Sequence, residues 1–226
     1  MILRANDLIP GQRVSLDQYQ STIRGRTPSS GGKEPDHLKY CGGTIGVDHA
    51  SGYVLFNHQL SFQTADTIHS KRLWERQAYT HGVKILLYHS DNGIFQSNEF
   101  QASLTSQHQT FSDQPIRFSG VGAHHQNGIV ERAFRTITEL SRAMLIHSAL
   151  HWPTETNEDL WPFSFNHAVN IWNHLPNKTT GLSPVEIFSG TRVDNSTFLT
   201  RLHVWGCPSY VLDPTLQDGK KLEANF

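Results

Sequence analysis

The most constraining feature of this sequence is an amphipathic helical segment that leads, through a glycine, into a short apolar run. Residues 64–80 carry apolar side chains at helical spacing, and Gly82 stands where that helix would end. Residues 83–88 are predicted to form an apolar strand, and the polar residues 89–93 follow as a turn. A strand reached through a crossover helix is typical of a parallel strand pair, so the sequence predicts an α/β fold.

The N-terminal third carries the patterns expected of strands. Residues 13–19 alternate between apolar and polar side chains, as in a half-buried strand. Residues 24–37 are rich in Gly, Pro and Ser and are predicted to form a loop. Two further strands are predicted over 43–48 and 53–59, with residues 50–52 as a hairpin turn between them.

The second half of the chain is predicted to be mainly helical. Its longest periodic segment runs from Gly128 to about Leu150, with apolar residues recurring at helical spacing. The other predicted elements are helices at 97–107, 159–175 and 183–188, a loop at 112–128 and a final strand at 204–212.

Composition bounds the function without selecting it. A chain of 226 residues, 37% hydrophobic and 17% charged, is long enough to bury a sizeable core. Lys and Arg number 19 against 20 Asp and Glu, so the basic surplus of a strongly basic nucleic-acid binder is lacking. The two cysteines, Cys41 and Cys207, favour a reducing compartment over a disulfide scaffold. No apolar run approaches the roughly 20 residues of a membrane helix.

Three acidic residues stand where strands and a helix could bring them together. Asp17 lies in the first predicted strand, Asp91 follows the strand at 83–88, and Glu131 lies in the first turn of the long helix. Carboxylates that converge at one sheet edge bind Mg²⁺ or Mn²⁺, and two such ions promote in-line phosphoryl displacement. Taken singly, each acid also fits a structural role, since a helix dipole alone favours Glu131.

The residues around these acids resemble the catalytic core of retroelement integrases. The two segments that carry the likeness are His89-Ser90-Asp91-Asn92-Gly93 and Gln126-Asn127-Gly128-Ile129-Val130-Glu131-Arg132. They are most similar to the copia type of long-terminal-repeat retrotransposon, within the retroviral integrase superfamily. Supporting similarities at 47–53, 173–176, 184–186 and 205–207 extend the resemblance over residues 10–212.

This resemblance implies an RNase H-like fold, in which a mixed five-stranded sheet is flanked by helices. It implies a catalytic core at residues 1–176 and a C-terminal extension at 177–226. The implied activity is DNA integration, in which element cDNA is trimmed at its 3′ end and joined to target DNA. The implied catalytic metal ligands are Asp17, Asp91 and Glu131, with two Mg²⁺ (or Mn²⁺) ions as cofactors. The implied partners are DNA and further copies of the chain, without a membrane, and the implied location is the nucleus after a cytoplasmic particle stage.

Asp48 is an alternative first carboxylate, because it lies closer to the matching segments than Asp17 does. The family's first catalytic Asp lies on the strand before the hairpin, however, and that position maps to Asp17. Two departures from the family pattern are visible. The interval between Asp91 and Glu131 is a few residues longer than usual, and His124 or His125 replaces a common Pro. Neither departure touches a predicted ligand, although both could alter loop closure.

Four residues near the start of the long helix or along it are predicted to contact nucleic acid: Asn127, Arg132, Arg135 and Arg142. Arg135 and Arg142 fall near the helix face that carries Glu131 and could lie along phosphates. Alternatively, this face is simply solvated and forms the pairs Glu131–Arg135 and Arg135–Glu139. Asn127 resembles a polar loop residue of the family that touches the DNA end.

Two other functions stay open at the sequence level. The chain could be an inactive or domesticated DNA-binding or multimerisation module that retains the fold, or an RNase H-type nuclease. The zinc-binding module and the basic tail that usually flank the family's core are not recognisable, so a polyprotein fragment or decayed element with weak DNA binding is expected. His147 and His151 are predicted to be surface residues, since no acid or Cys stands at matching ligand spacing.

Overall fold

The structure is a computed structural model that describes residues 8–28, 33–91, 93–104, 115–120 and 127–209. Its centre is one mixed sheet with the strand order β3-β2-β1-β4-β5. The strands are β1 (Val14–Gly25), β2 (Tyr40–Asp48), β3 (Val54–Gln59), β4 (Tyr88–Ser90) and β5 (Ile116–Phe118). The pairs β1–β2 and β2–β3 are antiparallel, whereas β1–β4 and β4–β5 are parallel.

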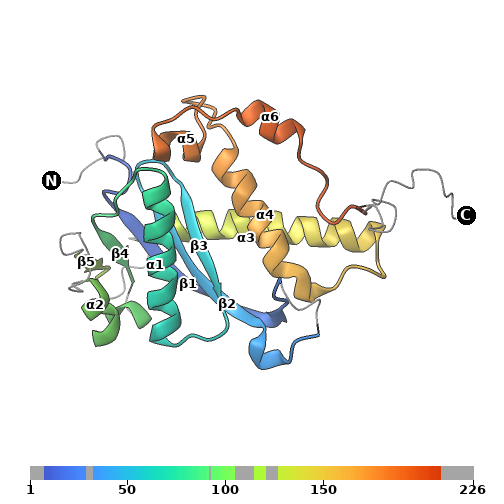
Figure 1. Ribbon diagram of the computed structural model, residues 1–226, viewed down its shortest axis with the longest axis horizontal. Helices are drawn as coiled ribbons and strands as arrows, with labels where there is room; N and C mark the ends of the chain where they lie inside the picture. The colour runs from blue at the N-terminus through green and yellow to red at the C-terminus, as the bar shows by residue number, and fades with distance from the viewer. Residues whose placement is uncertain (1–7, 29–32, 92, 105–114, 121–126, 210–226) are drawn as a thin grey trace, which may run out of the picture.

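Helices cover both faces of this sheet (Figure 1). The α-helices are α1 (Thr64–Thr80), α2 (Asn98–Leu104), α3 (Gly128–His151), α4 (Trp161–His174), α5 (Pro184–Ser189) and α6 (Asn195–Thr200). Short 3₁₀ turns are η2 (Asp36–Leu38), η3 (Ile94–Gln96) and η5 (Glu158–Leu160). The helices α1, α2 and α5 contribute to one buried apolar cluster, and α3 and α4 contribute to a second.

The alternation along β1 explains this division. Val14 and Leu16 belong to the cluster with α1, whereas Tyr19 belongs to the cluster with α3 and α4. Because successive side chains of a strand point to opposite faces, Ser15 and Asp17 share the face of Tyr19. The polar positions of β1 therefore lie on the α3 side of the sheet.

Most of the predicted elements are confirmed. The alternating segment is β1, the hairpin is β2 and β3, and the helix at 64–80 is α1. The long periodic segment is α3, and α4 and α5 lie within a residue or two of their predicted bounds. The helix at 97–107 is α2, of which residues 105–107 lie outside the described ranges.

Three sequence predictions about where strands lie are wrong. The strand at 83–88 is displaced, since β4 begins only at Tyr88. Among the earlier apolar residues, Ile85 is buried with 1% exposed, whereas Leu86 is 39% exposed. The predicted loop at 112–128 contains β5, whose three residues are too few to show a period. The predicted strand at 204–212 is absent over 204–209, where the chain turns and the N–H of Cys207 donates to Val204 O (3.1 Å).

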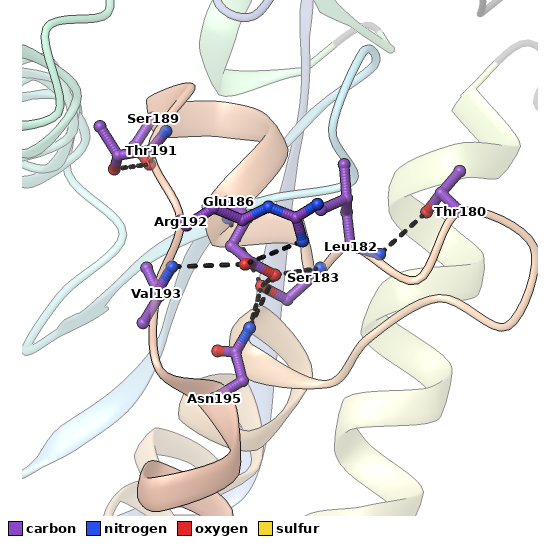
Figure 2. Close-up of polar contacts among 9 residues, drawn as sticks. All are labelled: Thr180, Leu182, Ser183, Glu186, Ser189, Thr191, Arg192, Val193 and Asn195. Atoms are coloured by element: carbon purple, nitrogen blue, oxygen red, sulfur yellow. Dashed lines mark hydrogen bonds and ion pairs between the residues drawn. The ribbon is translucent and has the colours of Figure 1, made fainter.

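The C-terminal segment packs on the α1 face of the sheet. The ring of Phe188 in α5 stacks on Tyr53, with centroids 4.4 Å apart and planes 12° from parallel. Figure 2 shows how Glu186 fixes this helix, because its carboxylate accepts hydrogen bonds from Ser183 and Asn195. The helix is thus anchored by the stacked ring of Phe188 and by the hydrogen bonds to Glu186.

Neither cysteine is in a disulfide, and Cys41 is buried. Among the helices that the structure describes, none combines the length and apolar character needed to cross a membrane.

Candidate active site

The register of two parallel strands brings Asp17 and Asp91 side by side. Leu16 of β1 pairs with Ser90, the last residue of β4, and the residues that follow this pair are Asp17, still on β1, and Asp91, directly after β4. Neighbouring strands lie about 4.8 Å apart, and corresponding residues of parallel neighbours point to the same face. The two carboxylates therefore share the sheet face that α3 covers.

The start of α3 is tied to β1 beside this pair. Asn127 directly precedes α3, and its Nδ2 donates to the carbonyl oxygen of Leu16 at 2.9 Å. This side chain is only 1% exposed, so the hydrogen bond is shielded from water. Glu131 follows one turn later and is exposed. This hydrogen bond fixes the first turn of α3 next to Leu16, the residue before Asp17. It thereby also positions Glu131, which lies in that turn.

The three carboxylates influence one another. The pKa of Asp17 is raised to about 6, chiefly by burial and to a smaller extent by the negative charges of Asp91 and Glu131, while a hydrogen bond from the Gln18 N–H (2.8 Å) opposes the rise. No ion pair in the described part of the chain includes any of the three acids. Mutual repulsion without a counter-charge is the electrostatic condition that a bound cation relieves.

Carboxylate oxygens are the ligands that Mg²⁺ and Mn²⁺ prefer, so this donor set fits such ions in kind. The side chains are not gathered as tightly as bound ligands would be. Over the described ranges, no three His, Cys, Asp or Glu side chains lie close enough together to hold one metal ion. The structure thus brings the three acids to one edge of the sheet without closing them around a common point.

The residues predicted to contact nucleic acid fall into two groups. Arg132, Arg135 and Arg142 are exposed on α3. Neither of the alternative pairs, Glu131–Arg135 and Arg135–Glu139, forms an ion pair.

Asn127, in contrast, is buried, and its amide positions α3. Arg142 also lines a cavity of about 440 Å³ between α3, α4 and the second half of β1.

Asp48 is occupied by structural contacts. Its carboxylate accepts hydrogen bonds from the Gly11 N–H (2.8 Å), the Ser51 N–H (2.9 Å) and the Ser51 hydroxyl (2.7 Å). It pairs with Val14, three residues before Asp17 on β1, and it is fully buried. These contacts give Asp48, the last residue of β2, a structural role, in which it stabilises the turn to β3.

His147 and His151 lie on the exposed side of α3 with ring centroids 4.4 Å apart, and no third ligand accompanies them within the described residues.

Sequence reasoning missed one basic residue near the acids, Arg117. Arg117 lies on β5, in the row of His89 and Ser15, on the sheet face that carries Asp17. The register of β4 and β5 is the signal that places it there. That signal could not be used from the sequence, because β5 lies in a segment predicted to be a loop.

No protein-family model matches this sequence, and no curated protein matches it. Solved structures do match in fold. The chain is 24% identical to the HTLV-2 integrase catalytic core domain in complex with magnesium in its trimeric form, with a TM-score of 0.52 over 80% of this chain and 98% of that one. The dimeric form of the same domain gives 26% identity and a TM-score of 0.52 over the same shares of the two chains.

Two further structures extend the likeness. The catalytic core domain of BIV integrase has a TM-score of 0.53 at 16% identity, over 85% of this chain and 99% of that one. A chain of the simian T-cell lymphotropic virus intasome in complex with PP2A regulatory subunit B56 gamma has a TM-score of 0.56 at 18% identity over 80% of this chain. The present chain spans 55% of that intasome chain. The fold is therefore the RNase H-like fold of retroviral integrase catalytic cores.

Proposed function

We propose that the chain is the catalytic core of an integrase-type polynucleotidyl transferase, which trims the 3′ end of an element cDNA and joins it to target DNA. The observation that carries this proposal is the parallel register of β1 and β4, which sets Asp17 beside Asp91, with Glu131 close enough to raise the pKa of Asp17. The fold shared with retroviral integrase cores supports it.

In this proposal, Asp17, Asp91 and Glu131 hold two Mg²⁺ or Mn²⁺ ions. When bound, these ions lower the pKa of water and stabilise the charge that develops on the attacking and leaving oxygens. Asp17 and Asp91 supply ligands from the rigid sheet, whereas Glu131 supplies its ligand from the exposed face of α3. Asn127 sets the distance between the two by its hydrogen bond to Leu16.

The substrate class follows from the same site. Arg132, Arg135 and Arg142 are exposed along α3 beyond Glu131 and carry no ion pair with described acids, so they are available to phosphates. We therefore propose DNA as the partner. We also propose a homo-oligomer, in line with the dimeric and trimeric forms of the HTLV-2 core, and a copia-type element as the source.

The domain boundary is likewise proposed rather than fixed by the similar structures. Residues 1–176 carry all of the site residues. Residues 177–226 form an extension, of which residues 177–209 are described, and its helix α5 packs on the core through Phe188.

The proposed function is tested by a strand-transfer assay with Mn²⁺ and a labelled duplex that ends in a free 3′-OH. The wild-type chain is expected to join this end to a target duplex, and Asp91→Asn is expected to abolish joining. Glu139→Gln removes an exposed acid two turns further along α3 and serves as the matched control, with joining at the wild-type rate.

Three outcomes overturn the proposal. Absence of joining by the wild-type chain supports the inactive module, and equal joining by Asp91→Asn removes the site from the chemistry. Cleavage of an RNA–DNA hybrid without DNA joining supports the RNase H-type nuclease instead.

A further inference from the structure

A row of basic and polar side chains lies on the sheet face of Asp17 and Asp91, one step back along the strands. The register pairs Ser15 with His89 and His89 with Arg117, so these residues are neighbours on β1, β4 and β5. Residues two apart along a strand share a face and lie about 7 Å apart. The row is therefore about 7 Å from the two carboxylates along the strand direction.

Two more residues, Arg13 and His49, lie opposite each other one step further from the acids than Ser15 does. Arg13 lies two residues earlier on the chain, and its carbonyl accepts the backbone N–H of His49 at 2.9 Å. Ser15 Oγ lies 2.8 Å from His49 Nε2 and 3.5 Å from His89 Nδ1, so the hydroxyl links the two rings. We call Arg13, Ser15, His49, His89 and Arg117 the basic row.

The basic row holds like charges close together. Burial, and then the charge of Arg117, lower the pKa of Arg13. Burial also lowers the pKa of His49 to about 4, and it lowers the pKa of His89; Arg13 contributes to both shifts.

The protein leaves part of this row unsatisfied. No ion pair within the described residues includes Arg13 or Arg117. Arg13 Nε is buried and has no hydrogen-bond partner among the described residues. A buried donor of this kind, beside unpaired guanidinium groups, is stabilised when an anion with several acceptor oxygens binds.

We propose that the basic row binds a phosphate of a DNA strand and thereby sets which phosphodiester of that strand reaches Asp17 and Asp91. The proposal rests on the proposed function for the identity of the strand. Arg13 and Arg117 supply charge-assisted donors to this phosphate. Because the acids repel a phosphate and the basic row attracts one, the strand has one favoured position along β1 and β4.

Binding of a fluorescent single-stranded DNA oligonucleotide, measured in EDTA, tests this proposal without a metal at the carboxylates. Arg117 is exposed, so Arg117→Gln is expected to fold. It is expected to weaken binding roughly tenfold and to lower the slope of log affinity against log salt by about 0.7. Arg13→Gln is expected to have an effect of similar size. Arg72→Gln, on the exposed side of α1 across the sheet, is the matched control and is expected to bind as the wild type does.

The proposal is overturned if Arg117→Gln and the Arg13→Gln/Arg117→Gln double variant keep the wild-type affinity and salt slope, or if Arg72→Gln loses as much. Strand transfer separates this result from the proposed function. If Asp91→Asn abolishes joining while Arg117→Gln binds normally, only the basic row is wrong. If the wild type joins nothing while Arg117→Gln weakens binding, the basic row stands and the proposed function is wrong.

Discussion

Two carboxylates near the core, those of Glu186 and Asp17, differ in their hydrogen bonds and in the direction of their pKa shifts. Glu186 of α5 accepts hydrogen bonds from the backbone and hydroxyl of Ser183 and from Asn195, and its pKa is lowered, chiefly by the Ser183 N–H (Figure 2). Among the described residues, Asp17 of β1 accepts one hydrogen bond, from the Gln18 N–H, and its pKa is raised to about 6, chiefly by burial. Within the described residues, the carboxylate of Glu186 therefore has several hydrogen-bond donors, whereas that of Asp17 has fewer.

The difference separates a structural acid from a candidate functional one. Glu186 stabilises the fold in its charged form, because every nearby donor favours the carboxylate. Asp17 destabilises the fold in its charged form, because burial and two further acids oppose the charge. A group whose charge the protein itself does not compensate is a candidate to bind a cation.

The largest expected effect on stability comes from Phe188, which lies in the same helix as Glu186 and packs on the core. Phe188 is 1% exposed and stacks on Tyr53. Phe188→Ala is expected to lower the free energy of unfolding by about 3–5 kcal/mol, since it leaves a cavity where α5 docks. Urea denaturation measures this change. Phe198→Ala, at a half-buried ring on α6, is the control and is expected to cost less. A cost below about 1 kcal/mol for Phe188→Ala would show that α5 does not stabilise the core.

The next effect has the opposite sign. Asp17→Asn is expected to raise the free energy of unfolding by about 2 kcal/mol at pH 7, because it removes a charge that the fold disfavours. The gain depends on pH. With a folded pKa near 6 and an unfolded pKa near 3.8, the wild type loses stability as the pH rises from about 4 to 6, and Asp17→Asn does not. Thermal unfolding of both proteins from pH 4 to 8 checks this. A constant difference across that range would contradict the raised pKa.

A smaller loss is expected at the satisfied acid. Glu186→Gln keeps the size of the side chain but replaces one of its acceptor oxygens with an amide. It is expected to lower the free energy of unfolding by less than Phe188→Ala does, because the donors of Ser183 and Asn195 lose a charged partner. Since the pKa of Glu186 is lowered, the wild type holds this advantage above the unfolded pKa and loses it as the pH falls through the folded pKa. A variant as stable as the wild type at pH 7 would remove the contrast with Asp17.

Much of the fold could be predicted from the sequence because its long elements carry strong periods. The 24 residues of α3 and the 17 residues of α1 each repeat an apolar face over several turns. The strands β4 and β5 have three residues each, which is too short for any pattern. Their place is set by pairing with β1, and that pairing is a tertiary property.

The candidate site could be predicted only in part. The matching segments predict Asp91 and Glu131 as site residues, and the position before the hairpin predicts Asp17, but neither pattern shows which of these side chains are exposed. Asn127 is predicted to contact DNA, yet its side chain is buried against Leu16, because the first turn of α3 packs directly on β1. The basic row could not be predicted at all, since it needs the register of β5.

The central claim is that Asp17, Asp91 and Glu131 together bind divalent ions. Mn²⁺ titration followed by electron paramagnetic resonance tests it directly, because free and bound Mn²⁺ give different signals. The wild-type chain is expected to bind two Mn²⁺ ions, Asp17→Asn and Asp91→Asn are expected to lose this binding, and Glu139→Gln is expected to keep it. Wild-type Mn²⁺ binding in Asp17→Asn and Asp91→Asn, or no binding by the wild type, would contradict the claim.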